Sequence, residues 1–441
     1  MRWQRLTQRA AFLVACGLIA AAALAGCTTR AGTGAGPRFV TPPLIHYTTI
    51  LWPVPLVLTG VEPGRRLRLS ASMRSEFGRW HSAATYTVPP SGTVDLATAR
   101  PQQAAFTEAD SAGLFWSLRG PAVDPSELMP LWMRSTVSVV LEARDGGRVV
   151  ASRAFSLDGP GANADPMTVG SLDIERAAAA AGEEHPPQLS IGGVIPVGAY
   201  FQARSAERPQ GPVVIVFDDP AVGVSSDYIA PLLTQFGAAV FVLPVRRAFT
   251  GVQTANVIEA TTVAAVLDWL DRRPEVDSTR IFTYGTSQSA QLALWAATRF
   301  NDRIEGVFAA GGATAPLCMR GAAVPPVSEN GERTLCQRSA SRIDQSRVFP
   351  LAAIDGPAVF ACAGRDEVLP NACAWMDAAL RARGARVGDQ VIRAPRSVHA
   401  MTVPPGLPIA LPEGAAAQAT EKARVAFWDA VGSVLLRASQ R

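Results

Sequence analysis

Uninterrupted apolar runs past residue 200 constrain the fold of this chain more than any other feature. Residues 212–217 (Pro-Val-Val-Ile-Val-Phe) and 238–245 contain no polar side chain. Runs of this kind predict strands that are covered on both faces, as in parallel sheets. Segments with helical periodicity alternate with them along residues 188–441. We therefore expect this region to form a mostly parallel, doubly wound sheet wrapped by helices.

The same periodicities predict the positions of the other strands and helices of this region. The region ends with an amphipathic helix. Further strands are expected at residues 280–284, 304–310, 357–363 and 389–393, and helices at residues 257–270, 288–300, 372–383 and 420–437.

Residues 44–158 show a two-residue periodicity instead. Apolar and other residues alternate over 67–73, 83–88 and 137–141, and Asp145-Gly146-Gly147 is a typical hairpin turn. Because no segment here has convincing helical periodicity, we expect an all-β domain, an immunoglobulin-like sandwich. Residues 159–187, which contain Pro and Gly and then a polar, Ala-containing segment, are expected to be a linker.

The N-terminus has the pattern of an export signal. Three arginines precede an apolar run of about 16 residues, which is short for a membrane span and typical of a signal peptide. The run ends in Leu24-Ala25-Gly26-Cys27, which resembles a bacterial lipobox. Residues 1–26 are therefore predicted to be removed and Cys27 to carry lipid, with residues 27–43 as a flexible tether. A secretory signal with an incidental cysteine is the alternative. The predicted location is the cell envelope, lipid-anchored at the outer membrane or facing the periplasm.

The distribution of basic residues argues against a nucleic-acid partner, and the spacing of histidines and cysteines argues against a zinc site. The formal net charge is only +4, and the 41 basic residues form no block of the kind that follows a phosphate backbone. None of the four histidines stands four residues from another, and the cysteine spacings are too wide for a zinc knuckle. We expect no metal and no cofactor.

Four cysteines other than Cys27 remain in the exported chain. An even number in an oxidising compartment favours two disulfides, for which three connectivities exist. Local pairing is favoured because both loops are then short, and free buried thiols are the alternative. The favoured pairs are Cys318–Cys336 and Cys362–Cys373.

Residues 285–289, Gly-Thr-Ser-Gln-Ser, lie between a predicted strand and a predicted helix. A serine on such a turn is typical of the nucleophile elbow of α/β hydrolases, in which triad residues follow in the order Ser, Asp or Glu, His. His399 is the only histidine after Ser287, and it follows the last predicted strand. Asp366 follows the preceding strand, with Glu367 as the alternative acid. Ser287 would be the nucleophile, His399 the base and Asp366 the residue that orients the imidazole.

An acyl-transfer site also needs hydrogen-bond donors for the oxyanion. The Gln288 N–H, at the start of the predicted helix, is the first candidate donor. A second is expected in the loop after Phe217, from Asp219 or Ala221, because Pro220 has no N–H. Asp218 and Asp219 resemble metal ligands, but we expect them to be a solvated pair.

Three runs in the first domain resemble the acyl-CoA thioester hydrolase/bile acid-CoA:amino acid N-acyltransferase family. They are residues 77–86 (Phe-Gly-Arg-Trp-His-Ser-Ala-Ala-Thr-Tyr), 92–96 (Gly-Thr-Val-Asp-Leu) and 112–118 (Ala-Gly-Leu-Phe-Trp-Ser-Leu). In the second domain the resemblance covers residues 226–233 and 273–276, the elbow, and the regions of Asp366 and His399. It implies a β-sandwich followed by an α/β hydrolase, with Ser287, Asp366 and His399 as the triad.

The resemblance implies a serine hydrolase that works through an acyl-enzyme, in the first place an acyl-CoA thioesterase. The family's amino-acid transferases use cysteine at the elbow, so Ser287 favours hydrolysis. Val398 stands where the family has glycine before the base. Two alternatives remain: an acyltransferase that moves the acyl group from a thioester to an amino acid, and an inactive, surface-anchored binding protein.

Overall fold

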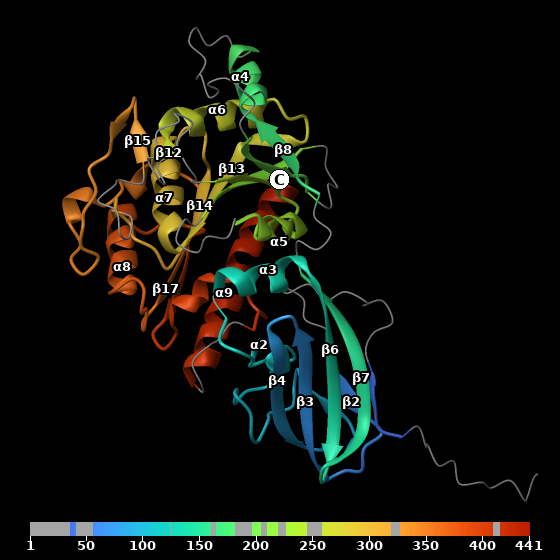
Figure 1. Cartoon of the computed structure of the whole chain (residues 1–441). Helices are drawn as coiled ribbons and strands as arrows, with labels where there is room; N and C mark the ends of the chain where they lie inside the picture. Colours follow the sequence, from blue (N-terminus) through green and yellow to red (C-terminus); the bar gives the residue numbers. More distant parts are fainter. Residues whose placement is uncertain are drawn as a thin grey trace, which may run out of the picture.

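The computed structural model has two parts (Figure 1), an antiparallel β domain and a larger α/β domain. It describes residues 36–40, 56–123, 125–159, 165–180, 196–203, 210–218, 226–244, 258–318, 327–408 and 415–441. The predicted signal peptide, Cys27 and most of the predicted tether lie outside these residues.

The β domain consists of two antiparallel sheets around one hydrophobic core. The three-stranded sheet has the order β1-β2-β5, with β1 Arg38–Val40, β2 Val57–Thr59 and β5 Val94–Asp95. The four-stranded sheet has the order β4-β3-β6-β7, with β3 Arg66–Ser75, β4 Gly78–Thr87, β6 Thr136–Asp145 and β7 Arg148–Asp158. Leu58 and Val94 of the first sheet share the core with Leu67 and Leu69 of the second.

The predicted hairpin turn joins β6 to β7. Gly146 and Gly147 have φ values of 54° and 96°, which suit glycine in a two-residue hairpin loop. The expectation of no helix in this domain is wrong, because α2 (Gly113–Trp116) and α3 (Pro125–Arg134) are present. The prolines at 125 and 130 conceal α3 in the sequence, yet Leu128, Met129 and Trp132 bury one helical face of it.

The α/β domain contains an eight-stranded sheet with the order β18-β17-β14-β13-β10-β11-β9-β8. Six adjacent strands, β18, β17, β14, β13, β10 and β11, are parallel, whereas β9 is antiparallel to both of its neighbours. This order and direction are those of the α/β-hydrolase fold, so the predicted fold class is confirmed. The strands are β8 Met167–Gly170, β9 Pro196–Phe201, β10 Gly211–Phe217, β11 Ala239–Leu243, β13 Val276–Thr286, β14 Gly306–Ala310, β17 Ala358–Ala363 and β18 Gln390–Ala394. A small separate sheet holds β12 Ile258–Glu259, β15 Val327–Glu329 and β16 Glu332–Arg333.

Alternate side chains of the buried strands face two different helical layers. Val213 and Ile215 of β10 pack in one core with α6 (Ala260–Asp271), α7 (Ala290–Arg299) and α8 (Ala372–Arg383). Val214 and Val216 pack in the other with α5 (Ala230–Leu233) and α9 (Ala415–Gln440). Both faces of the strand are therefore apolar, which is why β10 has no polar alternation.

The segment expected to be a linker, residues 159–187, contributes structure to the α/β domain. It contains β8, which pairs with β9 at the edge of the sheet, and α4 (Ser171–Ala180). A four-residue edge strand is too short to show periodicity, and the second half of α4 is mostly alanine, so neither element stands out in the sequence.

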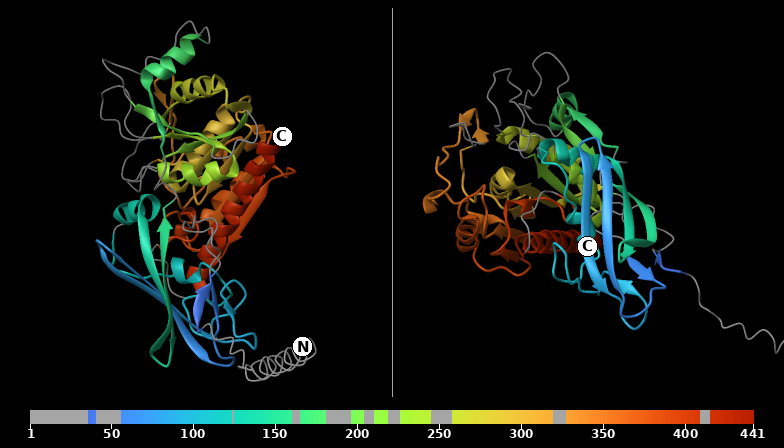
Figure 2. Two further views of the ribbon diagram at one scale, coloured as in Figure 1. Left: turned by 90° about the vertical axis from the view of Figure 1, so that its right-hand side faces the viewer. Right: turned by 60° about the horizontal axis from the view of Figure 1, so that its bottom comes forward.

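Helix α9 runs along the α/β sheet and reaches the β domain (Figure 2). Its Gln418 side chain accepts hydrogen bonds from the N–H and hydroxyl of Thr107, at 3.0 and 2.8 Å. Lys422 forms an ion pair with Glu108, and Ala417 packs into the core of the β domain. Among the described residues, no helix is long and apolar enough to cross a membrane.

Candidate active site

Ser287 lies at the sharp turn between β13 and the helical segment that begins with a 3₁₀ turn, Ser287–Ser289, and continues as α7. Its φ is +55°, a left-handed conformation that few residues other than glycine adopt. Non-glycine residues held in this conformation occur mainly where a neighbouring structure imposes it, as at active sites. The turn therefore has the geometry of a nucleophile elbow, with Ser287 at its apex.

Two glycines allow the elbow to fit between its neighbours. A Cβ on Gly285 would lie 2.2 Å from the carbonyl oxygen of Ser289, and a Cβ on Gly312 would lie 2.3 Å from that of Ser287. Both distances are far below van der Waals contact, so larger residues would displace the backbone. Ser289, which stands where a glycine is usual, is buried.

The Ser289 hydroxyl closes the turn. It accepts the backbone N–H of Thr286 at 3.0 Å and donates to the Thr286 carbonyl oxygen at 2.9 Å. The Thr286 side chain completes a capping box with the backbone of Ser289. The departure from glycine thus adds hydrogen bonds to the elbow without obstructing it.

The structure brings the three predicted triad residues together. His399 Nε2 lies 2.9 Å from Ser287 Oγ, and His399 Nδ1 lies 2.8 Å from both carboxylate oxygens of Asp366. The side chains of Asp366 and His399 are 1% and 14% exposed. Because a carboxylate can only accept, the Nδ1 position carries the proton, and Nε2 is left to accept the Ser287 hydroxyl.

Two backbone amides orient the Asp366 carboxylate. Its Oδ1 accepts the N–H groups of Val368 and Leu369, at 3.0 and 2.7 Å. Asp366 follows β17 and His399 follows β18, which are adjacent parallel strands. Their carboxyl ends therefore place the acid and the base side by side.

Glu367, the alternative acid in the sequence, has a different contact. Its carboxylate accepts the backbone N–H of His399 at 3.1 Å, whereas the imidazole ring is hydrogen-bonded to Asp366 and Ser287. Helix α9 holds the residues on either side: Thr420 Oγ1 accepts the Val398 N–H at 3.1 Å, and Arg424 Nε donates to the Ala400 carbonyl at 2.9 Å. The base loop, residues 397–402, is thus fixed through three successive backbone positions.

Of the predicted oxyanion donors, only Gln288 lies within the described residues. Gln288 follows Ser287 at the start of the 3₁₀ turn, so its N–H belongs to the first turn of the helical segment. Asp219 and Ala221 lie outside the described residues. Asp218 is buried rather than solvated, and its Oδ1 accepts both the N–H and the hydroxyl of Ser226, at 2.6 and 2.8 Å. It therefore joins the two ends of the loop that carries the predicted second donor.

Both favoured cysteine pairs are disulfide-bonded. Cys318–Cys336 has a Cα–Cα distance of 5.0 Å, and Cys362–Cys373 has one of 5.1 Å. The second disulfide connects β17 to the first turn of α8, and Asp366 lies in the loop that it closes. Within the described part of the chain, no group of three or more His, Cys, Asp or Glu residues is arranged to hold a metal ion.

Residues 52–156 match a family model described as acyl-CoA thioester hydrolase/BAAT N-terminal region. The resemblance expected for the first domain is confirmed. The matched region contains β2 to β6 and most of β7, and we therefore call the β domain the BAAT-type domain. A search of curated proteins gave no significant match.

Several solved structures are similar to parts of the chain. Est1E from Butyrivibrio proteoclasticus has 14% sequence identity and a TM-score of 0.35, covering 55% of this chain and 94% of that one. An esterase domain from Rhodothermus marinus has 13% identity and a TM-score of 0.34, covering 56% and 95%. A dipeptidyl aminopeptidase IV homologue from Bacteroides ovatus, named as putative, has 13% identity and a TM-score of 0.37, covering 85% and 48%.

The BAAT-type domain contacts the base loop directly and through α9. Ala400 and Val403, which follow His399, pack against the core of that domain. Beneath the loop, Arg424 and Glu421 form a buried ion pair at 3.1 Å. Burial raises the pKa of the Glu421 carboxyl, a shift opposed by the adjacent Arg424 guanidinium. Burial likewise lowers the pKa of Arg424.

Sequence reasoning missed this support for the base. The apolar periodicity of residues 420–437 predicts the helix but gives no role to Thr420, Glu421 and Arg424. These three polar residues are spaced at i, i+1 and i+4, on the same side of the helix as Ala417, and all are buried. Three polar residues on a helix face that packs into the protein core are unusual, and this pattern in the sequence could have indicated a role for them.

Proposed function

We propose that the protein is a serine hydrolase of acyl thioesters and esters, and that acyl-CoA-type thioesters are its preferred substrates. The single observation that supports this most is the continuous contact from Asp366 through His399 to Ser287 on the strained elbow. The BAAT-type domain favours a thioester over other acyl donors.

The proposed reaction has two halves. His399 Nε2 accepts the proton of Ser287 as Oγ attacks the acyl carbonyl carbon, and the Gln288 N–H stabilises the oxyanion. The C–S bond then breaks, the thiol takes the proton from His399, and an acyl-serine ester remains. Water next gives its proton to His399 and attacks that ester, which releases the carboxylic acid and restores the Ser287 hydroxyl.

Serine at the elbow supports hydrolysis rather than transfer to an amine. An oxyester acyl-enzyme undergoes aminolysis less readily than the thioester that a cysteine would form. We further propose that the mature chain is anchored at the cell envelope through lipid on Cys27, as the lipobox-like sequence suggests. Its natural acyl donor would then be a thioester or ester available outside the cytosol.

The test is an assay of the purified chain against acyl-CoAs of graded length and p-nitrophenyl esters, with Ser287→Ala as the paired control. We expect thioester hydrolysis that Ser287→Ala abolishes, together with labelling of Ser287 by a fluorophosphonate. Amide product in the presence of glycine or taurine would show an acyltransferase instead. A folded protein in which the probe labels no serine would be an inactive binding protein, and the proposal would fail.

A further inference from the structure

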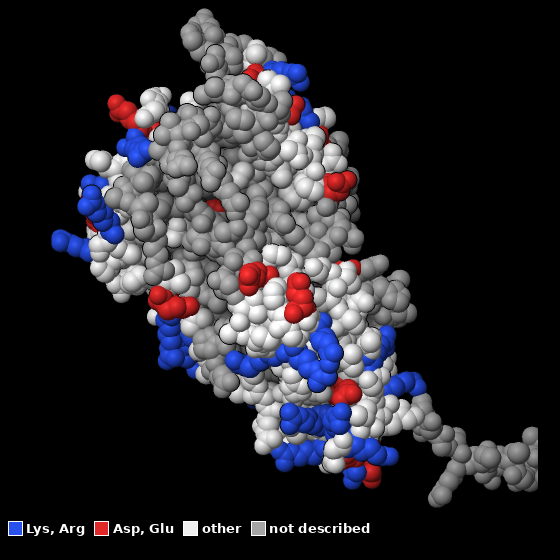
Figure 3. Space-filling model, viewed as in Figure 1, with Lys and Arg blue, Asp and Glu red and all other residues white. Residues whose placement is uncertain are grey.

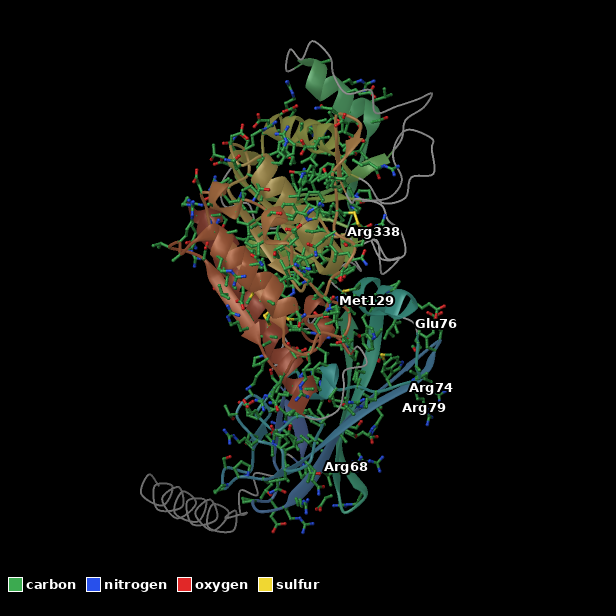
Figure 4. All side chains as sticks on the ribbon, turned by 90° about the vertical axis from the view of Figure 1, so that its left-hand side faces the viewer. Arg68, Arg74, Glu76, Arg79, Met129 and Arg338 are labelled. Carbon is green, nitrogen blue, oxygen red and sulfur yellow. A yellow bond between two sulfur atoms is a disulfide. The ribbon has the colours of Figure 1, made fainter. Side chains whose placement is uncertain are left out.

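The outer face of the four-stranded sheet in the β domain carries a group of arginines. On β3 the apolar residues Leu67, Leu69 and Met73 point into the core, and the alternate positions point outward. Outward positions hold Arg66, Arg68 and Arg74 on β3 and Arg79 on β4, and all four are exposed. We call these four residues the arginine face. Lys and Arg gather over this domain in Figure 3, and Figure 4 shows Arg68, Arg74 and Arg79 along one side of it.

The four residues of the arginine face differ from the neighbouring Arg144, because no acid among the described residues is bound to them. Arg144 of β6, which shares the face, is bound to Glu142 at 2.8 Å. None of the four arginines forms an ion pair with any described residue. Glu76 lies at the tip of the β3–β4 hairpin and is exposed, and it too forms no ion pair with a residue in the described ranges.

The strand register places like charges opposite each other. Arg74 pairs with Arg79 directly across β3 and β4. Like charges in directly opposed positions destabilise a sheet, and a chain can reduce this cost with a neighbouring acid. No acid among the residues that the structure describes forms an ion pair with Arg74 or Arg79. The arrangement therefore suits a surface whose counter-charge comes from another molecule.

The shape of the face identifies the kind of partner. Arg66 and Arg74 are separated along β3 by roughly 26 Å, far more than a single phosphate group spans. The other outward positions on these strands hold Ser70, Ser72, His81, Ala83, Thr85 and Thr87, and none is Phe, Tyr or Trp. Single-stranded nucleic acids are bound mainly by aromatic stacking, which this face does not offer. A broad, flat surface of negative charge matches it better.

We propose that the arginine face binds the anionic headgroups of a lipid bilayer. Arg66, Arg68, Arg74 and Arg79 would contact the phosphates without apolar insertion, since no large apolar side chain projects from these outward positions. This site is separate from the triad and independent of the proposed hydrolase reaction. It is consistent with the predicted lipid on Cys27, because β2 of the same domain begins at Val57, only about 30 residues along the chain.

The experiment uses the full mature chain with Cys27→Ser, so that no lipid contributes to binding. Co-sedimentation is measured with vesicles of phosphatidylcholine alone and with vesicles that contain 30 mol% phosphatidylglycerol. Arg66→Gln, Arg68→Gln, Arg74→Gln and Arg79→Gln are combined in one variant. The matched control combines Arg272→Gln, Arg333→Gln, Arg338→Gln and Arg381→Gln, four exposed arginines of the α/β domain with the same total charge change.

Each arginine near an anionic membrane surface increases binding by about five- to tenfold. Because four arginines are replaced, the arginine-face variant should partition at least 100-fold less onto phosphatidylglycerol vesicles. The control should change by less than threefold. Replacement of the same four residues by lysine should keep most of the binding, because lysine preserves the charge. Binding of the unsubstituted chain should fall as NaCl rises, and it should be weak on phosphatidylcholine alone.

Equal binding by the arginine-face variant and the unsubstituted chain would overturn the proposal, as would equal losses in both quadruple variants. Binding to duplex DNA or to heparin without binding to the vesicles would assign the face to another polyanion and would also overturn it. Thermal unfolding and fluorophosphonate labelling, measured on every variant, distinguish a lost surface contact from a failure to fold.

Discussion

The carboxylate of Glu367 holds the backbone of His399, at 3.1 Å from its N–H, while the neighbouring Asp366 contacts the imidazole ring. Two consecutive acids thus act on the same histidine in different ways. One fixes the position of the loop, and the other fixes the orientation and the proton of the ring.

This division of roles predicts different losses from similar substitutions. Asp366→Asn keeps an acceptor for the amides of Val368 and Leu369 but offers an N–H to the ring, which favours the wrong tautomer. We expect kcat to fall on the order of 10³–10⁴-fold. Glu367→Gln retains an acceptor for the His399 N–H and should change kcat by less than about threefold, whereas Glu367→Ala should cost roughly tenfold. A larger loss from Glu367→Gln than from Asp366→Asn would show that the acid is misassigned.

The elbow predicts a cost for removing the Ser289 hydroxyl. Ser289→Ala leaves the buried Thr286 N–H without its acceptor, so the free energy of unfolding should fall by about 1–3 kcal/mol. Urea unfolding measures this loss, and the rate of fluorophosphonate labelling should fall with it. Ser152→Ala, at an exposed position on β7, serves as the control and should have little effect. Equal stability of the two variants would contradict a hydrogen-bonding role for Ser289.

The disulfides predict equal effects on stability and unequal effects on activity. Cys362 and Cys373 are separated by 11 residues, and Cys318 and Cys336 by 18. In the loop-entropy model, either double substitution by alanine should cost about 3 kcal/mol. Only Cys362→Ala with Cys373→Ala should also lower kcat in protein that is still folded, because Asp366 lies inside that loop. Urea unfolding measures the stability of the two double variants, and steady-state kinetics below the unfolding transition measures their kcat. Equal kcat values would refute the link between the Cys362–Cys373 disulfide and activity.

His81 lies on the same outward face of the sheet as Arg68 and reports its electrostatics. Burial lowers the pKa of His81, and the positive charge of Arg68 lowers it further. Folding therefore favours the neutral imidazole, so this contribution to stability is present above the unfolded pKa and is lost as pH falls through that value toward the folded one. Proton NMR should show His81 titrating at lower pH in the folded chain than in urea. Arg68→Gln should raise the folded pKa only in part, because burial remains, and no change would remove Arg68 as a cause.

Much of the fold and the membership of the site could be predicted from the sequence. Continuous apolar strands such as β10 revealed the parallel sheet, because both of their faces are covered. The order Ser287, Asp366, His399 was sufficient to predict which side chains would meet, since adjacent parallel strands end at one edge of the sheet. Their catalytic roles stay a prediction until they are tested by substitution.

Features that depend on register or on short elements could not be predicted. Arg66, Arg68 and Arg74 share one face of β3 through its two-residue alternation, but only the pairing of β3 with β4 brings Arg79 opposite Arg74. Strand β8 escaped detection because only its last two residues, Val169 and Gly170, are buried. The roles of Asp366 and Glu367 depend on which carboxylate faces the ring, and two adjacent acids are alike in sequence.

Because α9 lies after the three triad residues in the sequence, it determines how much of the chain must be synthesised before the site is complete. A polypeptide that stopped at residue 408 would contain Ser287, Asp366 and His399, yet it would lack Thr420 and Arg424, which hold the backbone on both sides of His399. It would also lack Gln418 and Lys422, through which α9 contacts Thr107 and Glu108 of the β domain. A nascent or prematurely terminated chain would thus carry every reacting group and remain without an assembled site. In the full-length chain, the onset of activity would therefore mark the docking of α9 rather than the synthesis of the triad residues.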